Sequence, residues 1–360
     1  MSRMFSSHEK IISGIQQIGI GVTDAQEAWK WYREQFGMDI KVFEDENPAE
    51  LMLPYTDGKP RDKYAVLAFN MEGGGGFEIW QHLGIDPRHP HVNVLLGDLG
   101  LHTAKIKCRD IRRAYSAHIE RGLNVLGPLD KDPAGVPTYF IADPYGNIFQ
   151  VVEERVFFRK EKSLTGGVYG SIIGVSDIDE ARKVYSDILN YEEVVYDETG
   201  KFHDLSFLPG GDHTFRRVLL NHKNARLGAF SKLLGPSRIE LVQVLDREPQ
   251  KIYQDRLWGE LGYIHLCFDI TGMNKLKKEC DEKGFPFTVD SANTFDMGVS
   301  SGRFSYIEDL DGTLIEFVET HRLPIVKWLG LHMKLKGRRK FFKPLPKWMV
   351  LSLIFGREKD

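Results

Sequence analysis

The sequence of 360 residues predicts an α+β fold made of four copies of one unit, a strand followed by a helix and two or three further strands. Three observations carry this prediction. A segment starting at Gly14 repeats at Gly167. Two further segments, from Leu99 and from Leu261, follow the same plan. Short strand-like runs with turn residues between them follow each of the four.

The first repeat is visible at a constant offset of 153 residues. The coinciding pairs are Val22/Val175, Asp24/Asp177, Glu27/Glu180, Ala28/Ala181, Lys30/Lys183 and Tyr32/Tyr185. An apolar run over 15–22 or 168–175 predicts a strand, and the following pattern predicts a helix of about three turns. Asp24 and Asp177 are placed to cap the free amides at the start of these helices.

The other two segments complete the four units. In each, a glycine ends the predicted helix, Gly122 in one and Gly284 in the other. Runs such as YAVLAFN, TYFIADP, RIELVQV and FSYIEDL then predict the remaining strands. The units span about 14–82, 99–155, 167–246 and 261–320. We therefore divide the chain into an N-terminal tail 1–13, a module 14–155, a module 167–320 and a basic tail 321–360.

The amino-acid composition limits the classes of protein to which the chain can belong. The hydrophobic fraction of 42% and the charged fraction of 28% are ordinary for a globular protein. No apolar run reaches the roughly 18 residues of a membrane-spanning helix, and the start lacks the apolar stretch of a signal peptide. Three widely spaced cysteines do not form a disulfide framework or a CxxC pair. We expect a cytoplasmic protein.

Charge is distributed unevenly along the chain. Residues 321–360 hold 11 Lys and Arg against 2 Asp and Glu, a net +9, so the rest of the chain carries −12. This tail also contains Trp328, Trp348 and Phe355. Two interpretations stay open: peripheral contact with an anionic membrane surface, or packing of the tail against the acidic body or a second subunit. Prolines in the tail exclude one long amphipathic helix. Nucleic-acid binding is not expected of the acidic body.

The second and fourth units close with related motifs. They read DPYGNIFQVVE, from Asp143, and EDLDGTLIEFVE, from Glu308. Together with the four units, these motifs resemble the vicinal-oxygen-chelate superfamily, which includes glyoxalase I, bleomycin resistance proteins and extradiol dioxygenases. The resemblance covers nearly all of 14–320. It implies two cup-shaped mixed β-sheets flanked by helices, each formed by two βαβββ units, with a small-molecule site on the concave face.

The resemblance also implies two ligand positions in each unit, one in the first strand and one in the last. The first-strand positions are Gln17, His102, Gly170 and His265, and the last-strand positions are Glu78, Gln150, Glu240 and Glu316. How the units pair decides the site. Pairing of neighbours would give Gln17, Glu78, His102 and Gln150 in one cup, and Glu240, His265 and Glu316 in the other.

Crosswise pairing, as in domain-swapped glyoxalases, would combine the first and fourth units instead. The set is then Gln17, Glu78, His265 and Glu316, which is similar to the ligand set of the zinc-type glyoxalase I group. The remaining pair would leave an alternative second site of His102, Gln150 and Glu240. Two carboxylates offset the charge of a divalent ion. We expect Zn, Ni, Co, Mn or Fe(II), because these ligands do not select among them.

The activity implied by the resemblance is a metal-dependent lyase or isomerase of the glyoxalase I type, acting on a small molecule with adjacent oxygens through an enediolate. Glu316 is the first candidate for the catalytic base and Glu78 the second. Two alternatives remain: an iron dioxygenase, for which Gly170 stands where a histidine is required and His203 is a substitute, and a metal-free binding or resistance protein. Arg33, Arg216 and Arg217 are interpreted as solvated arginines. A monomer and a homodimer are both compatible with the sequence.

Overall fold

The structure is a computed structural model that describes residues 10–90, 93–292, 295–296, 301–326, 331–334 and 343–358. Its strands in the first half are β1 (Ile11–Gly21), β2 (Ile40–Asp45), β3 (Lys63–Phe69), β4 (Gly76–His82), β5 (Gly100–Cys108), β6 (Asn124–Lys131), β7 (Pro137–Ala142) and β8 (Ile148–Glu153). Those in the second half are β9 (Thr165–Gly174), β10 (Glu193–Gly200), β11 (Phe215–Asn221), β12 (Arg238–Val244), β13 (Gly262–Thr271), β14 (Val289–Asp290), β15 (Phe295–Asp296), β16 (Ser301–Glu308), β17 (Leu314–Val326) and β18 (Leu331–Lys334). The helices are α1 (Ala25–Phe36), α2 (Ile111–Glu120), α3 (Ile178–Tyr185), α4 (Ser231–Leu234), α5 (Met273–Lys283) and α6 (Lys347–Leu351), with short 3₁₀ turns η1 (Leu53–Tyr55), η2 (His203–Leu205) and η5 (Ser352–Gly356).

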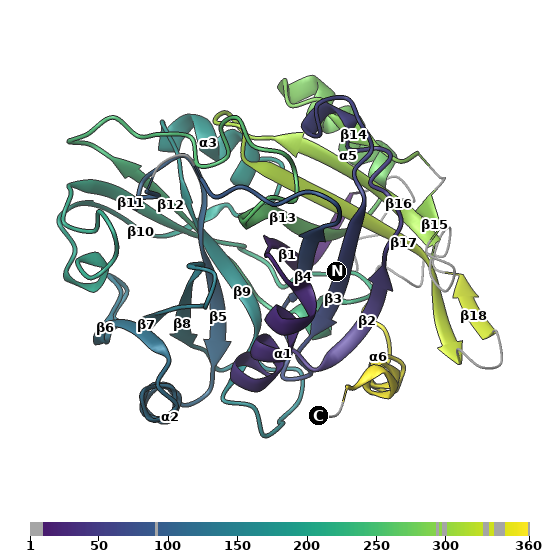
Figure 1. Cartoon of the computed structure of the whole chain (residues 1–360), viewed down its shortest axis with the longest axis horizontal. Coiled ribbons are helices and arrows are strands. Elements are labelled where there is room, and N and C mark those ends of the chain that lie inside the picture. The colour runs from purple at the N-terminus through teal and green to yellow at the C-terminus, as the bar shows by residue number, and fades with distance from the viewer. Residues whose placement is uncertain are drawn as a thin grey trace, which may run out of the picture.

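The described strands form two sheets, and each sheet takes strands from both halves of the chain (Figure 1). The first sheet has the order β14-β16-β17-β13-β1-β4-β3-β2, so it joins the fourth unit to the first through the antiparallel pair β13 and β1. The second sheet has the order β10-β11-β12-β9-β5-β8-β7-β6 and joins the third unit to the second. The units therefore pair crosswise. The α+β fold of four repeated units is confirmed, whereas the division into modules 14–155 and 167–320 stays a prediction.

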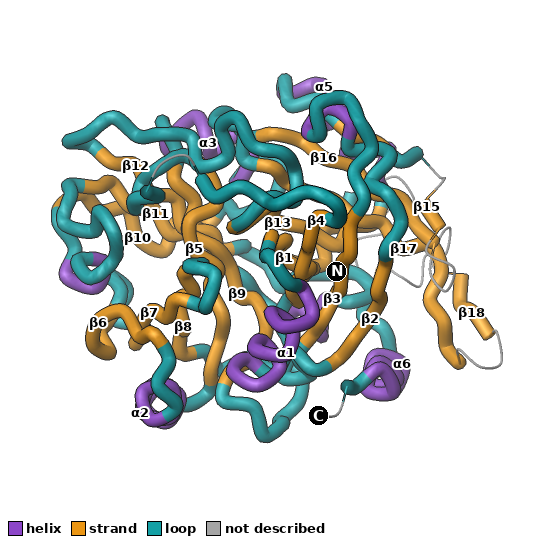
Figure 2. Tube along the Cα trace, viewed as in Figure 1, coloured by secondary structure: helices purple, strands orange, loops and turns teal. Residues whose placement is uncertain are grey.

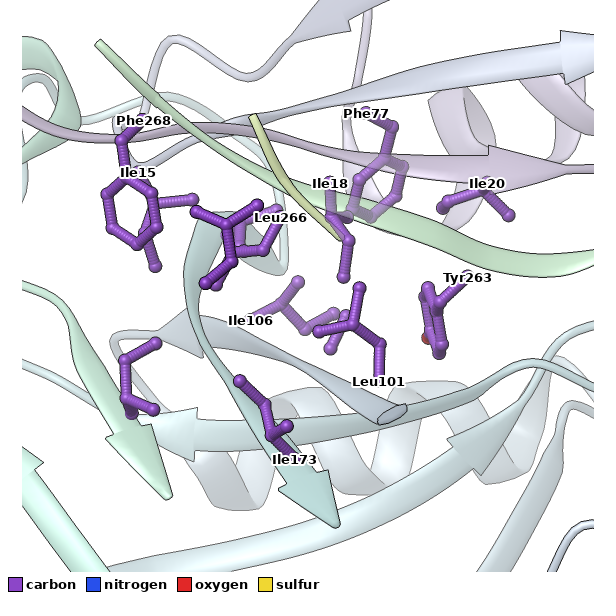
Figure 3. Close-up of a cluster of buried hydrophobic side chains, with 14 of the residues drawn as sticks. Ile15, Ile18, Ile20, Phe77, Leu101, Ile106, Ile173, Tyr263, Leu266 and Phe268 are labelled. Atoms are coloured by element: carbon purple, nitrogen blue, oxygen red, sulfur yellow. The ribbon is translucent and has the colours of Figure 1, made fainter. Parts of the chain in front are cut away.

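The main core lies between the two sheets, as alternate side chains of facing strands require. Ile18, Phe77 and Leu266 of the first sheet approach Leu101 and Ile106 of the second (Figure 3). Helices stand at the flanks and loops join the strands around the rim (Figure 2). Because the apolar residues of β1, β4 and β13 face this core, the alternate residues of the same strands face the opposite, concave side of the first sheet.

The predicted helix boundaries are confirmed. The side chain of Asp24 accepts hydrogen bonds from the amides of Gln26 and Glu27, and Asp177 does the same for α3. At the other end, Gly284 adopts the left-handed conformation that stops α5. These caps satisfy amides and carbonyls that a helix cannot pair internally.

The repeated tyrosines and the closing motifs bind each other. The hydroxyl of Tyr32 donates to Asp143 Oδ2 at 2.6 Å, and that of Tyr185 donates to Asp309 Oδ2 at 2.7 Å. Asp143 also accepts amide hydrogen bonds within its own turn, as Asp309 does. Each pair is buried and links one unit to the next along the chain. The motifs that marked the repeat are therefore structural: they hold neighbouring units together while the sheets join crosswise.

The C-terminal tail is only partly described. Residues 343–358, which include α6 and η5, pack beside β2 and α4, near the C-terminus in Figure 1. Trp328 of the tail lies outside the described residues. Among the described residues, no helix is long and apolar enough to cross a bilayer.

Candidate metal centre

Four adjacent strands in the middle of the first sheet place the predicted ligands together. The parallel pair β1 and β4 sets Gly19 opposite Glu78, and the parallel pair β13 and β17 sets Cys267 opposite Glu316. Gln17 on β1 lies opposite Cys267, two residues beyond His265 on β13. Since side chains alternate along a strand, Gln17, Glu78, His265 and Glu316 all project from the concave face.

Their polar atoms converge. His265 Nε2 lies 3.1 Å from Glu78 Oε2 and 3.1 Å from Glu316 Oε2. Gln17 Nε2 donates a hydrogen bond of 3.2 Å to Glu78 Oε2. Among the described residues, the ligand atoms of Glu78, His265 and Glu316 all lie within 4.8 Å of one another. The group is enclosed: His265 is fully buried, and the side chains of Glu78 and Glu316 are only 13% and 9% exposed.

The group is electrostatically incomplete without a cation. Burial lowers the pKa of His265, but the negative charges of Glu316 and Glu78 outweigh this effect and raise the pKa to about 10. A protonated His265 would then balance only one of the two carboxylates. Uncompensated negative charge inside a protein is strongly unfavourable. A divalent cation would remove this imbalance, because it replaces one proton with two positive charges.

Three buried atoms of these side chains support the fit. Gln17 Oε1, His265 Nε2 and Glu316 Oε2 make no well-formed hydrogen bond among the described residues. Two atoms bound about 2.1 Å from one ion at adjacent octahedral positions lie about 3 Å apart, which is the spacing of His265 Nε2 from both carboxylates. The two ends of a Gln amide are interchangeable by rotation, so Gln17 can present its oxygen to the same point. The residues therefore fit a divalent metal.

Gly19 is a part of the site that the sequence did not reveal. A Cβ atom at this position would lie 2.6 Å from His265 Cε1 and 2.9 Å from Nε2. The imidazole thus occupies the space that any larger residue on β1 would fill. The signal was present, because Gly19 follows Gln17 on the same face of a strand, where glycine is unusual unless another group approaches closely.

Gly19→Ala is expected to push the imidazole of His265 off its position and to weaken metal binding by about 10- to 100-fold, the range observed when a ligand loses its outer support. Overpacking of this kind destabilises a protein by about 1–3 kcal/mol. Metal titration and chemical denaturation measure the two effects. In a His265→Ala background the clash disappears, so the same Gly19→Ala change should then destabilise much less. An equal loss of stability from Gly19→Ala in both backgrounds would show that the imidazole of His265 does not occupy the space beside Gly19.

Aromatic side chains form the wall beside His265. The ring of Trp258 is parallel to the imidazole, with an interplanar angle of 12° and a centroid distance of 6.2 Å. Tyr306 approaches the imidazole edge-on, and its hydroxyl lies 3.5 Å from His265 Nδ1. Trp80 packs against Trp258 at 4.4 Å. These rings fix the imidazole and shield it from water, which strengthens its interaction with charge.

Trp258 also lines a cavity of about 190 Å³. Its lining includes Ile264 and Leu314, which directly precede or flank the ligand positions, and the charged side chains of Arg256 and Glu308. The ligands themselves do not line it. Trp258 is therefore shared: one face stacks on the candidate metal ligand, and the residue also borders a space large enough for a small molecule.

Comparison with known proteins agrees with this geometry. Residues 14–151 match the family model of the Glyoxalase/Bleomycin resistance protein/Dioxygenase superfamily. Residues 14–151 therefore form a domain of this superfamily. Glyoxalase I from Zea mays has a similar structure, with a TM-score of 0.55 at 13% identity over 86% of this chain and 92% of that one. A putative dioxygenase from Bacillus subtilis subsp. subtilis str. 168 has a TM-score of 0.58 at 14% identity over 98% of each chain. No curated protein sequence matches.

The second sheet carries different side chains at the positions equivalent to the candidate ligands. Lys105 pairs with Gly170 and Gln150 in the second sheet, just as Cys267 pairs with Gln17 and Glu316 in the first. The residue equivalent to His265 is therefore Thr103, two positions before Lys105. His102 lies in an irregularity between Leu101 and Thr103, and a shift of one residue moves a side chain to the other face.

The structure does not bring His102 together with Gln150 and Glu240 as a ligand group. His102 Nδ1 lies 2.8 Å from Thr103 Oγ1, and burial lowers the pKa of His102 to about 4. Gln150 and Glu240 do meet, but the group between them is the ammonium of Lys105, which donates to Gln150 Oε1 and lies 2.6 Å from Glu240 Oε2. The ammonium of Lys105 thus supplies a positive charge in the second sheet, at the region equivalent to the one where Glu78 and Glu316 converge in the first sheet.

Arg217 completes this buried network. Its guanidinium donates to Glu240 Oε1 at 2.7 Å and to both carboxylate oxygens of Asp204. The interpretation of Arg217 as a solvated arginine was wrong, since it is fully buried; the neighbouring Arg216 is partly exposed and pairs with Asp179 and Asp197 at the surface. The sequence gives two adjacent arginines on a strand, and only the sheet decides which one faces inward. His203 lies exposed beside Asp130 at the surface.

Proposed function

We propose that this protein is a metal-dependent enzyme of the glyoxalase I type, acting on a small molecule with adjacent oxygen atoms. The observation that carries the proposal is the buried group formed by Glu78, His265 and Glu316, with Gln17 beside it. One imidazole, two carboxylates and one amide leave free coordination positions on a six-coordinate ion. Free positions are what distinguishes a catalytic from a structural metal site.

The divalent cation would supply positive charge for two substrate oxygens where negative charge develops. The residues of the chain do the rest. His265 and Gln17 hold the cation, and the rings of Trp258 and Tyr306 hold the imidazole and exclude water. Glu316 is the base that takes a proton from the carbon bearing the hydroxyl and returns it to the adjacent carbonyl carbon, while the hydroxyl proton passes to the former carbonyl oxygen; its Oε2 makes no hydrogen bond among the described residues. Glu78, whose Oε2 accepts a hydrogen bond from Gln17, is the second candidate.

The iron dioxygenase alternative is weaker. Non-haem iron oxygenases use two histidines and one carboxylate. Here the described ligand group contains one histidine and two carboxylates. His82, on the same face of β4 as Glu78, is buried but does not belong to this group, and His203 lies at the surface. The metal-free alternative describes the second cup better than the first, because there Lys105 and Arg217 neutralise the carboxylate of Glu240.

Solvent exchange tests the proposed chemistry without knowledge of the natural substrate. The metal-loaded protein is mixed in D₂O with hydroxyacetone, dihydroxyacetone or the adduct of methylglyoxal and glutathione, and proton NMR follows the C–H signal of the carbon that bears the hydroxyl next to the carbonyl. We expect faster loss of this signal than in buffer for at least one probe. Glu316→Gln should slow it by about 10²- to 10⁴-fold, the usual contribution of a general base. Rates equal to buffer for every probe, with metal bound, would refute the proposed chemistry.

A further inference from the structure

The C-terminal segment 343–358 packs one of its sides against the body of the protein. Leu345 and Val350 are buried against the cluster that contains Leu67 and Phe69. The amide of Leu345 donates to the carbonyl of Ala229 at 2.9 Å. Near the end of the segment, Arg357 Nε lies 3.1 Å from Asp39 Oδ2. Contacts at both ends hold the segment on the body in one orientation.

The outer face presents two large aromatic side chains to water. Phe355 is 93% exposed and Trp348 is 64% exposed, the highest values for large apolar residues among those that the structure describes. They are seven residues apart on the continuous helical stretch formed by α6 and η5. Such exposure is not needed for folding, since Met349 and Val350 already supply the inward contacts.

Exposed lysines accompany the aromatic pair. Lys343 and Lys347 are both exposed, and Lys347 Nζ lies 5.2 Å from the ring centroid of the buried Phe158. We call Lys343, Lys347, Trp348 and Phe355 the C-terminal aromatic face. In sequence, the 40 residues that contain it carry a net charge of +9. Aromatic rings that sit at the headgroup level together with lysines define an interfacial anchor.

We propose that the C-terminal aromatic face rests on an anionic membrane surface, with Trp348 and Phe355 inserted at the headgroup level and Lys343 and Lys347 paired with lipid phosphates. The positive charge of this face favours an anionic membrane over a second copy of the chain as its binding partner. A two-fold contact through this face would bring the lysines of one copy next to those of the other, which is unfavourable. An anionic lipid surface complements the same charges. The inference does not depend on the proposed enzyme activity.

Sedimentation with vesicles tests this proposal. The full chain is mixed with phosphatidylcholine vesicles, with or without about one-third phosphatidylserine, and the bound fraction is measured. We expect binding to the anionic vesicles that high salt removes. Trp348→Ser with Phe355→Ser should reduce binding to background. Lys343→Gln with Lys347→Gln should weaken it by about 10- to 30-fold, since each lysine near an anionic surface contributes about 1 kcal/mol.

Ile119→Ser is the matched control, because Ile119 is 50% exposed on α2, away from this face. It should bind like the wild type, and all variants should keep the wild-type circular dichroism and thermal midpoint. Equal binding of the wild type to neutral and anionic vesicles, or unchanged binding of the aromatic double variant, would overturn the proposal. Concentration-dependent dimerisation that the aromatic double variant abolishes would assign the face to a second copy and would also overturn it.

Discussion

Replacing His265 with alanine is expected to remove tightly bound metal from the purified protein. His265 Nε2 is the single atom that faces both Glu78 Oε2 and Glu316 Oε2 at 3.1 Å. Loss of an outer partner of a ligand already weakens metal binding by about 10- to 100-fold, so loss of the ligand itself should exceed about 100-fold. Elemental analysis and titration with Zn or Co measure the change. Glu316→Gln should also weaken binding, because it removes one of the two charges that neutralise the ion.

His102→Ala is the matched control. His102 is also buried on the first strand of its unit, and its Nε2 makes no hydrogen bond among the described residues. It lies beside Thr103, however, and the charge in its cup is supplied by Lys105. We therefore expect wild-type metal content in His102→Ala and at most one tightly bound ion per chain. Equal, near-zero metal in the wild type and in both histidine variants would reject the metal centre.

Replacing Arg217 with methionine is expected to destabilise the fold by about 3–5 kcal/mol, the usual effect of leaving buried charges without their partner. Arg217 is fully buried and contacts Glu240 and Asp204, which are also buried. The adjacent Arg216 provides the control, because it too bonds two carboxylates, but at the surface. Arg216→Met should change the free energy of unfolding by about 1 kcal/mol or less. Urea denaturation of both variants at neutral pH makes the comparison, and similar losses would contradict the buried network.

The same network has a pH signature. Burial raises the pKa of Glu240, but Arg217 and Lys105 outweigh it and lower the pKa to about 2. Because the pKa in the folded protein lies below the usual glutamate value of 4.5, the ionised carboxylate stabilises the fold above about pH 4.5, and this contribution is lost as the pH falls toward 2. Arg217→Met raises that pKa and should flatten the acid limb of the stability curve. Arg216→Met should flatten this limb much less, because Arg216 lowers the pKa of two aspartates at the surface, Asp179 and Asp197, where solvent screens the interaction.

The sequence predicted much of the secondary structure, for local reasons. Aspartates at 24 and 177 cap helices through amides two and three residues away, and Gly284 ends a helix through its own backbone conformation. Such features depend on neighbours in the chain and can be read there. The repeat itself was equally visible, because tyrosines 32 and 185 must each reach an aspartate in the closing turn of the next unit.

The candidate site was predictable only as a set of alternatives. His102 was predicted to be the equivalent of His265, but it lies one residue early when the segments are counted from Leu99 and Leu261, and the strand pairing gives that place to Thr103. The sequence did not single out Gly19, because its contribution is the absence of a side chain, which leaves room for the imidazole of His265. Arg216 and Arg217 are indistinguishable in sequence, yet the fold buries one beside two carboxylates and leaves the other partly exposed at the surface.

By itself, the sequence determined the four units and the helix caps at Asp24, Asp177 and Gly284, whereas the ligand positions came from the family resemblance and one of them, His102, was misplaced. The tertiary structure decided which units share a sheet. It placed β1 beside β13, so that carboxylates 78 and 316 meet one imidazole, and β5 beside β9, so that the ammonium of Lys105 meets Glu240. The reason is physical: strand pairing joins residues about 250 positions apart through backbone hydrogen bonds that every sequence can make, so the choice of partner rests on the packing of the whole core.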